Sequence, residues 1–190
     1  MHHDDFGEIV YDADLRAWTG WCALPGFAEC GRAESQTNFL STPTPEFGRG
    51  QFPLEIRDED GSGPRLPQAN AIRYVREHEA DVCRVVLGQL VEACDMKGGP
   101  IAWLQERRDS RLWGWLARAV GPEYKTPEDM KPAVRCKLVE VSATPAGEYA
   151  FVALHFETIF AIESEHGLSV VYHPQREAFC GDATAISDAN

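Results

Sequence analysis

Apolar and polar residues alternate most regularly in the last third of the chain. In the segment 147–163, one face of an extended chain carries Val152, Leu154, Phe156, Phe160 and Ile162. The opposite face carries Tyr149, Phe151, His155, Glu157 and Glu163. Because successive side chains of a strand point to opposite faces, this pattern predicts a strand with one face toward a core. Residues 133–143 show a similar alternation and predict a strand before it.

The middle of the chain has a helical spacing instead. Between residues 64 and 96, steps of three and four residues place on one stripe Ile72, Val75, Val82, Val86, Leu90 and Ala93. Such a stripe is typical of an amphipathic helix and predicts one long helix here. A second helix is predicted over 101–119. A further helix start is predicted at Thr126, with Pro127 and Asp129 at favourable first-turn positions.

The first 57 residues predict strands and turns. Residues 6–27 have the pattern of a hairpin with a turn at Asp12–Asp14, residues 28–50 that of a loop, and Phe52–Arg57 that of a strand. Along the whole chain, the predicted order is three strands, two helices and three strands. This order predicts an α+β fold, with an antiparallel sheet of about six strands and two main helices packed on one face. The 190 residues suit a single domain, 1–190, with room for a helical insertion at about 97–130.

The stretch 163–173, "ESEHGLSVVYH", predicts a tight hairpin. Glu165–Gly167 fits a three-residue loop in which Gly167 adopts the left-handed conformation. In that register Ile162 pairs with Val170, so apolar side chains meet on the core face. A shift by one residue would lose this match. Gly167 is therefore expected to be a structural turn residue.

Histidines and acids near this hairpin suggest an alternative, a metal or hydrolytic site. His155, Glu157 and His173 would share the outer face of neighbouring strands, and His166 would lie at the loop tip. Neither an HExxH spacing nor a nucleophile motif such as GxSxG accompanies them. The turn is the favoured interpretation. We therefore expect no metal, no cofactor and no enzymatic activity.

The charge balance is strongly acidic, with 18 basic and 30 acidic residues and a net charge of −12. Such a surface repels phosphate backbones, which disfavours nucleic acid, and it attracts a basic protein. The expected contact residues lie in acidic loops and are Asp58, Glu59, Asp60, Glu163, Glu165 and His166.

The cysteines and the N-terminal sequence indicate in which cellular compartment the protein is expected. None of the six cysteines forms a CxxC pair, and neither a signal-peptide pattern nor an apolar run near the roughly 20 residues of a membrane span is present. The sequence therefore predicts reduced and mostly buried thiols in a cytoplasmic protein that does not enter the membrane.

Several segments resemble a family of uncharacterised small bacterial proteins. "EHGL" at Glu165–Leu168, followed by "AFCGDATAI", is similar to the family ending W-D-E-E-H-G-L-G-V, a strand, and G-x-A-D. The segments "WTG" at Trp18–Gly20, "FPLEIRDED" and "LPQANAI" are similar as well. Ile162 replaces the family tryptophan, Ser164 an acid and Ser169 the second glycine, so a site built on those family residues would not carry over.

The resemblance implies a cytoplasmic α+β protein. Related small families lie beside toxin genes, which implies a non-catalytic immunity protein that neutralises a bacterial toxin domain by direct binding. A small metal-dependent or hydrolytic enzyme is the first alternative to this hypothesis. A structural or regulatory interaction protein is the second.

Overall fold

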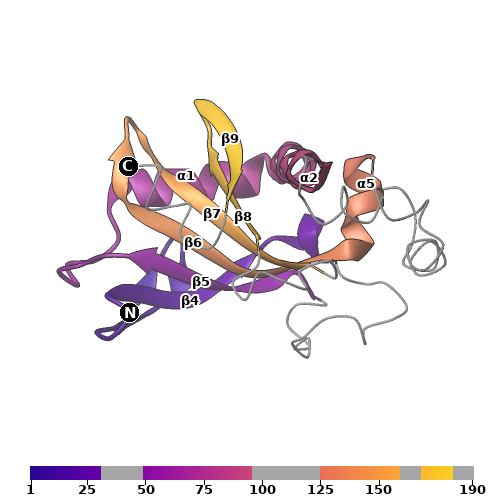
Figure 1. The fold of residues 1–190 in the computed structure, drawn as a ribbon. Helices are drawn as coiled ribbons and strands as arrows, with labels where there is room; N and C mark the ends of the chain where they lie inside the picture. Colours follow the sequence, from indigo (N-terminus) through magenta and orange to yellow (C-terminus); the bar gives the residue numbers. More distant parts are fainter. Residues whose placement is uncertain (31–48, 96–124, 159–167, 182–190) are drawn as a thin grey trace, which may run out of the picture.

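A seven-stranded sheet with helices packed on one face is the centre of the computed structural model (Figure 1). The structure describes residues 1–30, 49–95, 125–158 and 168–181. The strands are β1 (His2–His3), β2 (Gly7–Glu8), β3 (Val10–Asp12), β4 (Ala17–Ala23), β5 (Gln51–Arg57), β6 (Val134–Ala146), β7 (Tyr149–Thr158), β8 (Leu168–His173) and β9 (Arg176–Gly181). The helices are α1 (Leu66–Glu77), α2 (Glu79–Asp95) and α5 (Pro127–Met130), with short 3₁₀ turns η1 (Pro25–Phe27) and η4 (Lys131–Ala133).

The sheet follows the chain order β3-β4-β5-β6-β7-β8-β9, and β1 and β2 form a separate hairpin. Every neighbouring pair in the large sheet is antiparallel except β5 and β6, which are parallel. Between these two strands the chain passes through α1 and α2, as a parallel connection requires. The predicted α+β class and mainly antiparallel sheet are confirmed. The large sheet has one strand more than the predicted six or so. The additional strand is β9, which the alternation of apolar and polar residues did not indicate.

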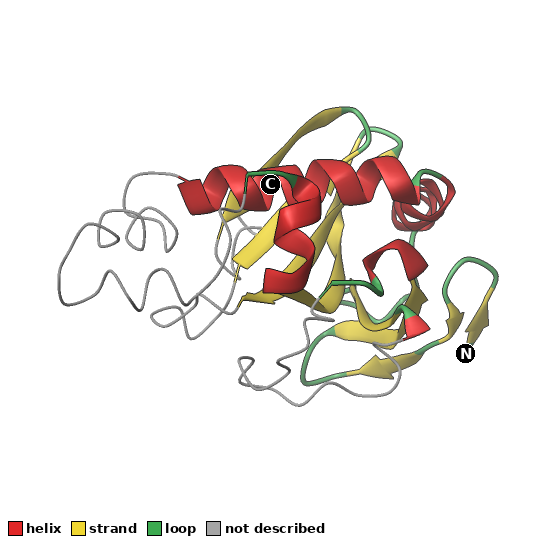
Figure 2. Ribbon diagram, turned by 90° about the vertical axis from the view of Figure 1, so that its right-hand side faces the viewer, coloured by secondary structure: helices red, strands yellow, loops and turns green. Residues whose placement is uncertain are grey.

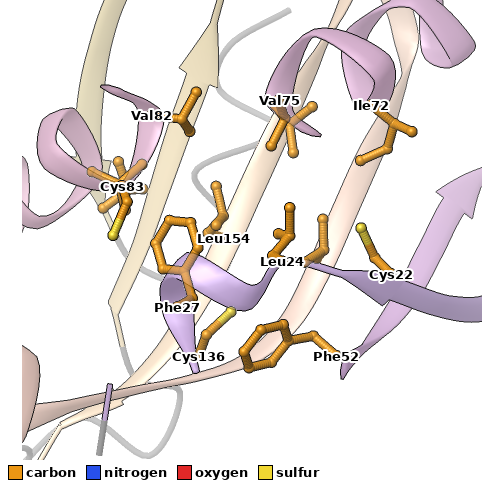
Figure 3. Packing of buried hydrophobic residues seen from close by; sticks show 14 of the residues in the cluster. Cys22, Leu24, Phe27, Phe52, Ile72, Val75, Val82, Cys83, Cys136 and Leu154 are labelled. Carbon is orange, nitrogen blue, oxygen red and sulfur yellow. The ribbon is translucent and has the colours of Figure 1, made fainter. Parts of the chain in front are cut away.

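The core lies between the sheet and the helices α1 and α2 (Figure 2). Ile72 and Val75 of α1 and Val82 of α2 are fully buried in one cluster with Leu154 of β7. Figure 3 shows these side chains together with Phe27 and Phe52. The apolar stripe and the apolar strand face predicted from the sequence therefore meet.

Four cysteines belong to this core: Cys22, Cys30, Cys83 and Cys136. Their prediction as buried small side chains is confirmed. Burial raises the pKa of the Cys83 thiol to about 11 and raises that of Cys136 well above 9.0, so both remain protonated near neutral pH. Cys22, Cys30, Cys83, Cys136 and Cys180 are free thiols. No described helix has the length and apolarity to cross a membrane.

The predicted long helix is two helices, a correction with a local cause. His78, between α1 and α2, leaves the helical conformation with φ −115° and ψ 27°. Its imidazole Nδ1 lies 3.1 Å from the Tyr74 carbonyl, and its ring stacks on that of Tyr74 at 4.1 Å. The next helix starts when Val82 N–H bonds to the His78 carbonyl. The stripe continues across the break because both helices pack on the same sheet.

Helix α5 begins as predicted. The Thr126 hydroxyl accepts the Asp129 amide at 3.2 Å, and the Asp129 carboxylate accepts the Thr126 amide at 3.1 Å. This reciprocal pair is a capping box, here with Asp in the third position. The predicted helix over 101–119 and most of the suggested insertion at about 97–130 lie outside the described residues.

The predicted register of the C-terminal hairpin is wrong. Leu168 of β8 pairs with Phe156 and Val170 with Leu154, eight residues before the expected partner Ile162. An apolar pattern of period two matches equally well after any even shift, so the core face of Leu154, Phe156 and Val170 was predicted correctly while their pairing was not. The predicted positive φ of Gly167 lies outside the described residues.

Candidate functional site

The turn after β5 carries three of the predicted contact residues, Asp58, Glu59 and Asp60. Asp58 was expected to be exposed, but the structure buries it. Asp58 is only 3% exposed. Its carboxylate accepts the Trp18 indole N–H at 2.9 Å and the Gly63 amide at 2.8 Å. Burial alone would raise the pKa of Asp58, but these hydrogen bonds together lower it below 3.8. Asp58 therefore holds the turn in place and is not an exposed loop charge.

Glu59 and Asp60 are exposed, as predicted, and the β3–β4 turn lies beside them. The Tyr11 hydroxyl donates to the carbonyl of Asp58 at 3.3 Å, and the Asp58 amide donates to the carbonyl of Arg16 at 3.0 Å. Asp14, in the β3–β4 turn, is also exposed. Asp14, Glu59 and Asp60 together are called the acidic tip below.

Both turns of the acidic tip are internally fixed. The Asp12 carboxylate accepts the amides of Asp14 and Leu15 at 3.0 and 3.1 Å, which closes the β3–β4 turn. Arg65 lies 3.7 Å from Asp60 and partly balances its charge. Among the described residues, no ion pair involves Asp14 or Glu59. The tip can therefore offer the carboxylates of Asp14 and Glu59, which form no ion pair among the described residues, on a rigid support.

The other predicted contacts, Glu163, Glu165 and His166, lie outside the described residues, as does Gly167. Their roles stay predictions.

A second feature is a chain of polar side chains, of which Glu140 and Ser169 are buried, on the sheet face opposite the helices, called the second face below. Arg57 Nε donates to Glu140 Oε1 at 2.5 Å, and His155 Nε2 lies 2.9 Å from Glu140 Oε2. Ser169 Oγ lies 2.7 Å from His155 Nδ1. These four residues, from β5, β6, β7 and β8, form what we call the polar network, with Arg57 at its partly exposed end. They meet because the strands bring Glu140 and His155, and His155 and Ser169, onto the same face of adjacent ladders.

Electrostatics keeps the network's carboxylate ionised. Burial by itself raises the pKa of Glu140, but the hydrogen bonds from His155 and Arg57 and the Arg57 charge lower it below 4.5. Since a carboxylate only accepts, His155 Nε2 must carry a proton. The Ser169 hydroxyl can then donate to a bare Nδ1 or accept from a protonated one.

A hydroxyl, an imidazole and a carboxylate in one chain resemble the groups of a serine hydrolase, but their placement does not suit that chemistry. Ser169 is 0% exposed, so its Oγ cannot meet a substrate. Ser169 also lies within β8 between two paired strands, away from the sharp turn that presents a nucleophile beside amide donors for an oxyanion. The network is best understood as a satisfied structural arrangement.

The other residues of the suggested metal or hydrolytic site have separate partners. Glu157 accepts Arg135 Nη2 at 2.6 Å in a buried ion pair. His173 Nε2 lies 3.0 Å from the Ala146 carbonyl. Within the part of the chain that the structure describes, no group of three His, Cys, Asp or Glu side chains is placed to hold a metal ion. The structure therefore does not bring His155, Glu157 and His173 into one site.

Sequence reasoning placed His155 and Glu157 on one face correctly but missed Arg57, Glu140 and Ser169. The alternation along β7 gives the face on which His155 lies. Its partners Glu140 and Ser169, however, lie on neighbouring strands, 15 residues earlier and 14 residues later in the chain. Only the true register of three ladders shows that these side chains meet. The available signal was a polar residue at a second-face position of each strand.

Comparisons with protein-family models, curated proteins and solved structures find no match for this chain. The resemblance to small bacterial proteins stays a prediction.

Proposed function

We propose that this protein is a non-catalytic immunity protein, which binds a basic toxin domain and blocks it. The acidic tip is the observation that carries the proposal. It presents the exposed side chains of Asp14, Glu59 and Asp60 on two turns that hydrogen bonds hold together. The net charge of −12 adds a long-range field of the same sign. Complementary charge of this kind speeds association and selects a partner of opposite sign.

The rigidity of the tip supports binding rather than mere solubility. Asp58 is held by Trp18 and Gly63, and Tyr11 donates to the Asp58 carbonyl. A loop that is already ordered loses little conformational entropy when a partner docks. Solubility alone would require exposed charge but no such support.

The test uses the proteins encoded beside this gene, each expressed alone and together with this protein. We expect one of them to be toxic alone, harmless in the pair, and recovered as a stable complex. Its association rate should fall steeply as salt rises, because exposed charges are screened over roughly 8–10 Å near physiological ionic strength. If no neighbour is toxic, or if protection occurs without a complex and depends on His155 or His173, the proposal is wrong and the enzyme alternative replaces it.

A pair of charge-reversal variants tests the surface itself. Glu59→Lys/Asp60→Lys changes the tip, whereas Glu77→Lys/Glu92→Lys makes the same charge change at exposed positions of α1 and α2. We expect the tip variant to associate at least about tenfold more slowly than the control, since local charge governs steering. Equal rates for the two variants would show that the tip is not the contact surface. Both should keep their unfolding free energy within about 0.5 kcal/mol of wild type.

A further inference from the structure

His173 is a buried histidine whose two contacts define its protonation state. It ends β8 and is 2% exposed. Its Nδ1 accepts the amide N–H of Gln175 at 3.1 Å, and its Nε2 lies 3.0 Å from the carbonyl oxygen of Ala146. An amide N–H only donates and a carbonyl only accepts. Nδ1 is therefore bare and Nε2 carries the proton, which makes the ring neutral.

Among the described residues, no further acceptor is hydrogen-bonded to this ring. The imidazole packs on Phe151 at 4.9 Å and meets the edge of Tyr149 at 6.1 Å. Arg176 of β9 lies over the same Phe151 ring at 5.2 Å and would repel a charged imidazole. The Tyr149 ring also contacts the ring of Tyr74 of α1, and their centroids are 5.7 Å apart. Glu148 of the β6–β7 turn and Glu177 of β9 are exposed, and no ion pair links His173 to an acid among the described residues.

We propose that His173 is an acid-sensitive latch, which joins the β8–β9 turn to the end of β6 and releases both when it takes up a proton. A proton on Nδ1 would face the Gln175 N–H, so this hydrogen bond must break. The protonated ring must also leave its apolar site or remain there without a counter-charge. Acid should therefore open this corner locally before the whole fold is lost.

His155 provides an internal contrast on the same face. Its Nε2 faces the Glu140 carboxylate and its Nδ1 faces the Ser169 hydroxyl, which can donate or accept. His155 keeps both hydrogen bonds whether it is neutral or charged. The acid response should accordingly be confined to the His173 corner.

The test measures amide hydrogen exchange at Gln175 and at Tyr149, the ladder partner of Ala146, corrected for intrinsic exchange, between about pH 8 and pH 5, where histidine titrates. In wild type we expect opening to increase as pH falls, by up to about tenfold per pH unit, the limit for uptake of one proton. His173→Asn should remove this dependence, because an Asn side-chain oxygen can accept the amide two residues later without titrating. His155→Gln should retain it. Wild-type exchange that is independent of pH, or that responds to His155→Gln instead, would overturn the latch.

Nitrogen NMR of the wild-type ring gives a second measurement that needs no variant. At neutral pH we expect an unprotonated Nδ1 and a protonated Nε2 on His173. A proton on Nδ1 at neutral pH would also refute the proposal.

Discussion

The two faces of the sheet at β6, β7 and β8 are both buried, but only one of them contains a network of polar side chains. Toward the helices stand fully buried apolar side chains, among them Val139, Leu154 and Val170. On the second face the same strands bear Glu140, His155 and Ser169, joined by hydrogen bonds of 2.7 to 2.9 Å. The second face also carries a small apolar cluster of Phe151, Ala153 and Val171. The helix face is thus held by apolar packing, and the second face by polar pairs together with this cluster.

This difference predicts that mutation and pH affect the stability of the two faces differently. Apolar burial depends on volume and shape and hardly on pH. Polar burial depends on every donor having its acceptor, because an unpaired buried group costs about 1–3 kcal/mol. Removal of atoms should therefore weaken the helix face, and removal or neutralisation of charge should weaken the second face. The predictions below test this contrast, from the largest expected effect to the smallest.

The largest effect is expected on the helix face. Leu154→Ala removes a side chain that is 0% exposed and packed in the main cluster. It should lower the free energy of unfolding by about 2–5 kcal/mol, the range for a buried leucine replaced by alanine. Urea denaturation measures this loss. The loss should be the same at neutral and mildly acidic pH, and a loss that changes with pH would contradict the assignment of this face to packing alone.

Glu140→Gln should weaken the second face by about 1–3 kcal/mol at neutral pH, because a charged acceptor of two hydrogen bonds is lost. Its effect should depend on pH. The pKa of Glu140 is below its ordinary value of 4.5, so its contribution is complete above that value and is lost as pH falls through the folded-state pKa. Between about pH 6 and pH 3, wild type should therefore lose more stability than Glu140→Gln. Parallel curves would show that the Glu140 charge does not stabilise the fold.

The contrast between the faces also explains how much of the fold the sequence could predict. Alternation identifies which residues of β7 are apolar and inward, and the stripe from Ile72 to Leu90 identifies the helix surface that covers them. Both depend on local periodicity, and both agree with the structure. The β7–β8 register depends on contacts between distant residues, and the break at His78 depends on local contacts with Tyr74 that the apolar periodicity does not indicate. Both were mispredicted.

The candidate sites show the same division. The acidity of the β5 turn is visible in the sequence, but the inward orientation of Asp58 requires Trp18, forty residues earlier. His155 was assigned to the correct face, whereas Glu140 and Ser169 become its partners only through strand pairing. The role of a polar residue in a strand cannot be read from the sequence until its partner is known. The same residue type can be exposed, paired or catalytic.

Ser169→Ala should have a smaller effect than either change above. It leaves Glu140, Arg57 and His155 joined and removes only the hydroxyl beside His155 Nδ1. A neutral hydrogen bond contributes about 0.5–1.5 kcal/mol, so we expect a loss in that range by urea denaturation. His155→Phe supplies the matched change on the other partner. If the two losses add without coupling in the double variant, the short contact does not stabilise the protein.

The smallest effect is expected where the second face reaches its edge. Val10 of β3 lies on this face, because the ladders place Val10 opposite Thr19 and Thr19 opposite Glu55, and Glu55 is the partner of Glu140. Unlike Ser169, Val10 is 69% exposed, so burial of the second face does not extend to β3. Val10→Thr keeps the β-branched shape and adds a polar group that water can solvate. We expect its unfolding free energy to stay within about 0.5 kcal/mol of wild type, as for other exposed positions. A loss above about 1 kcal/mol, comparable to a buried polar mismatch, would show that the second face is covered out to this strand. The contrast between the two faces would then concern their chemistry only and not the extent of their burial.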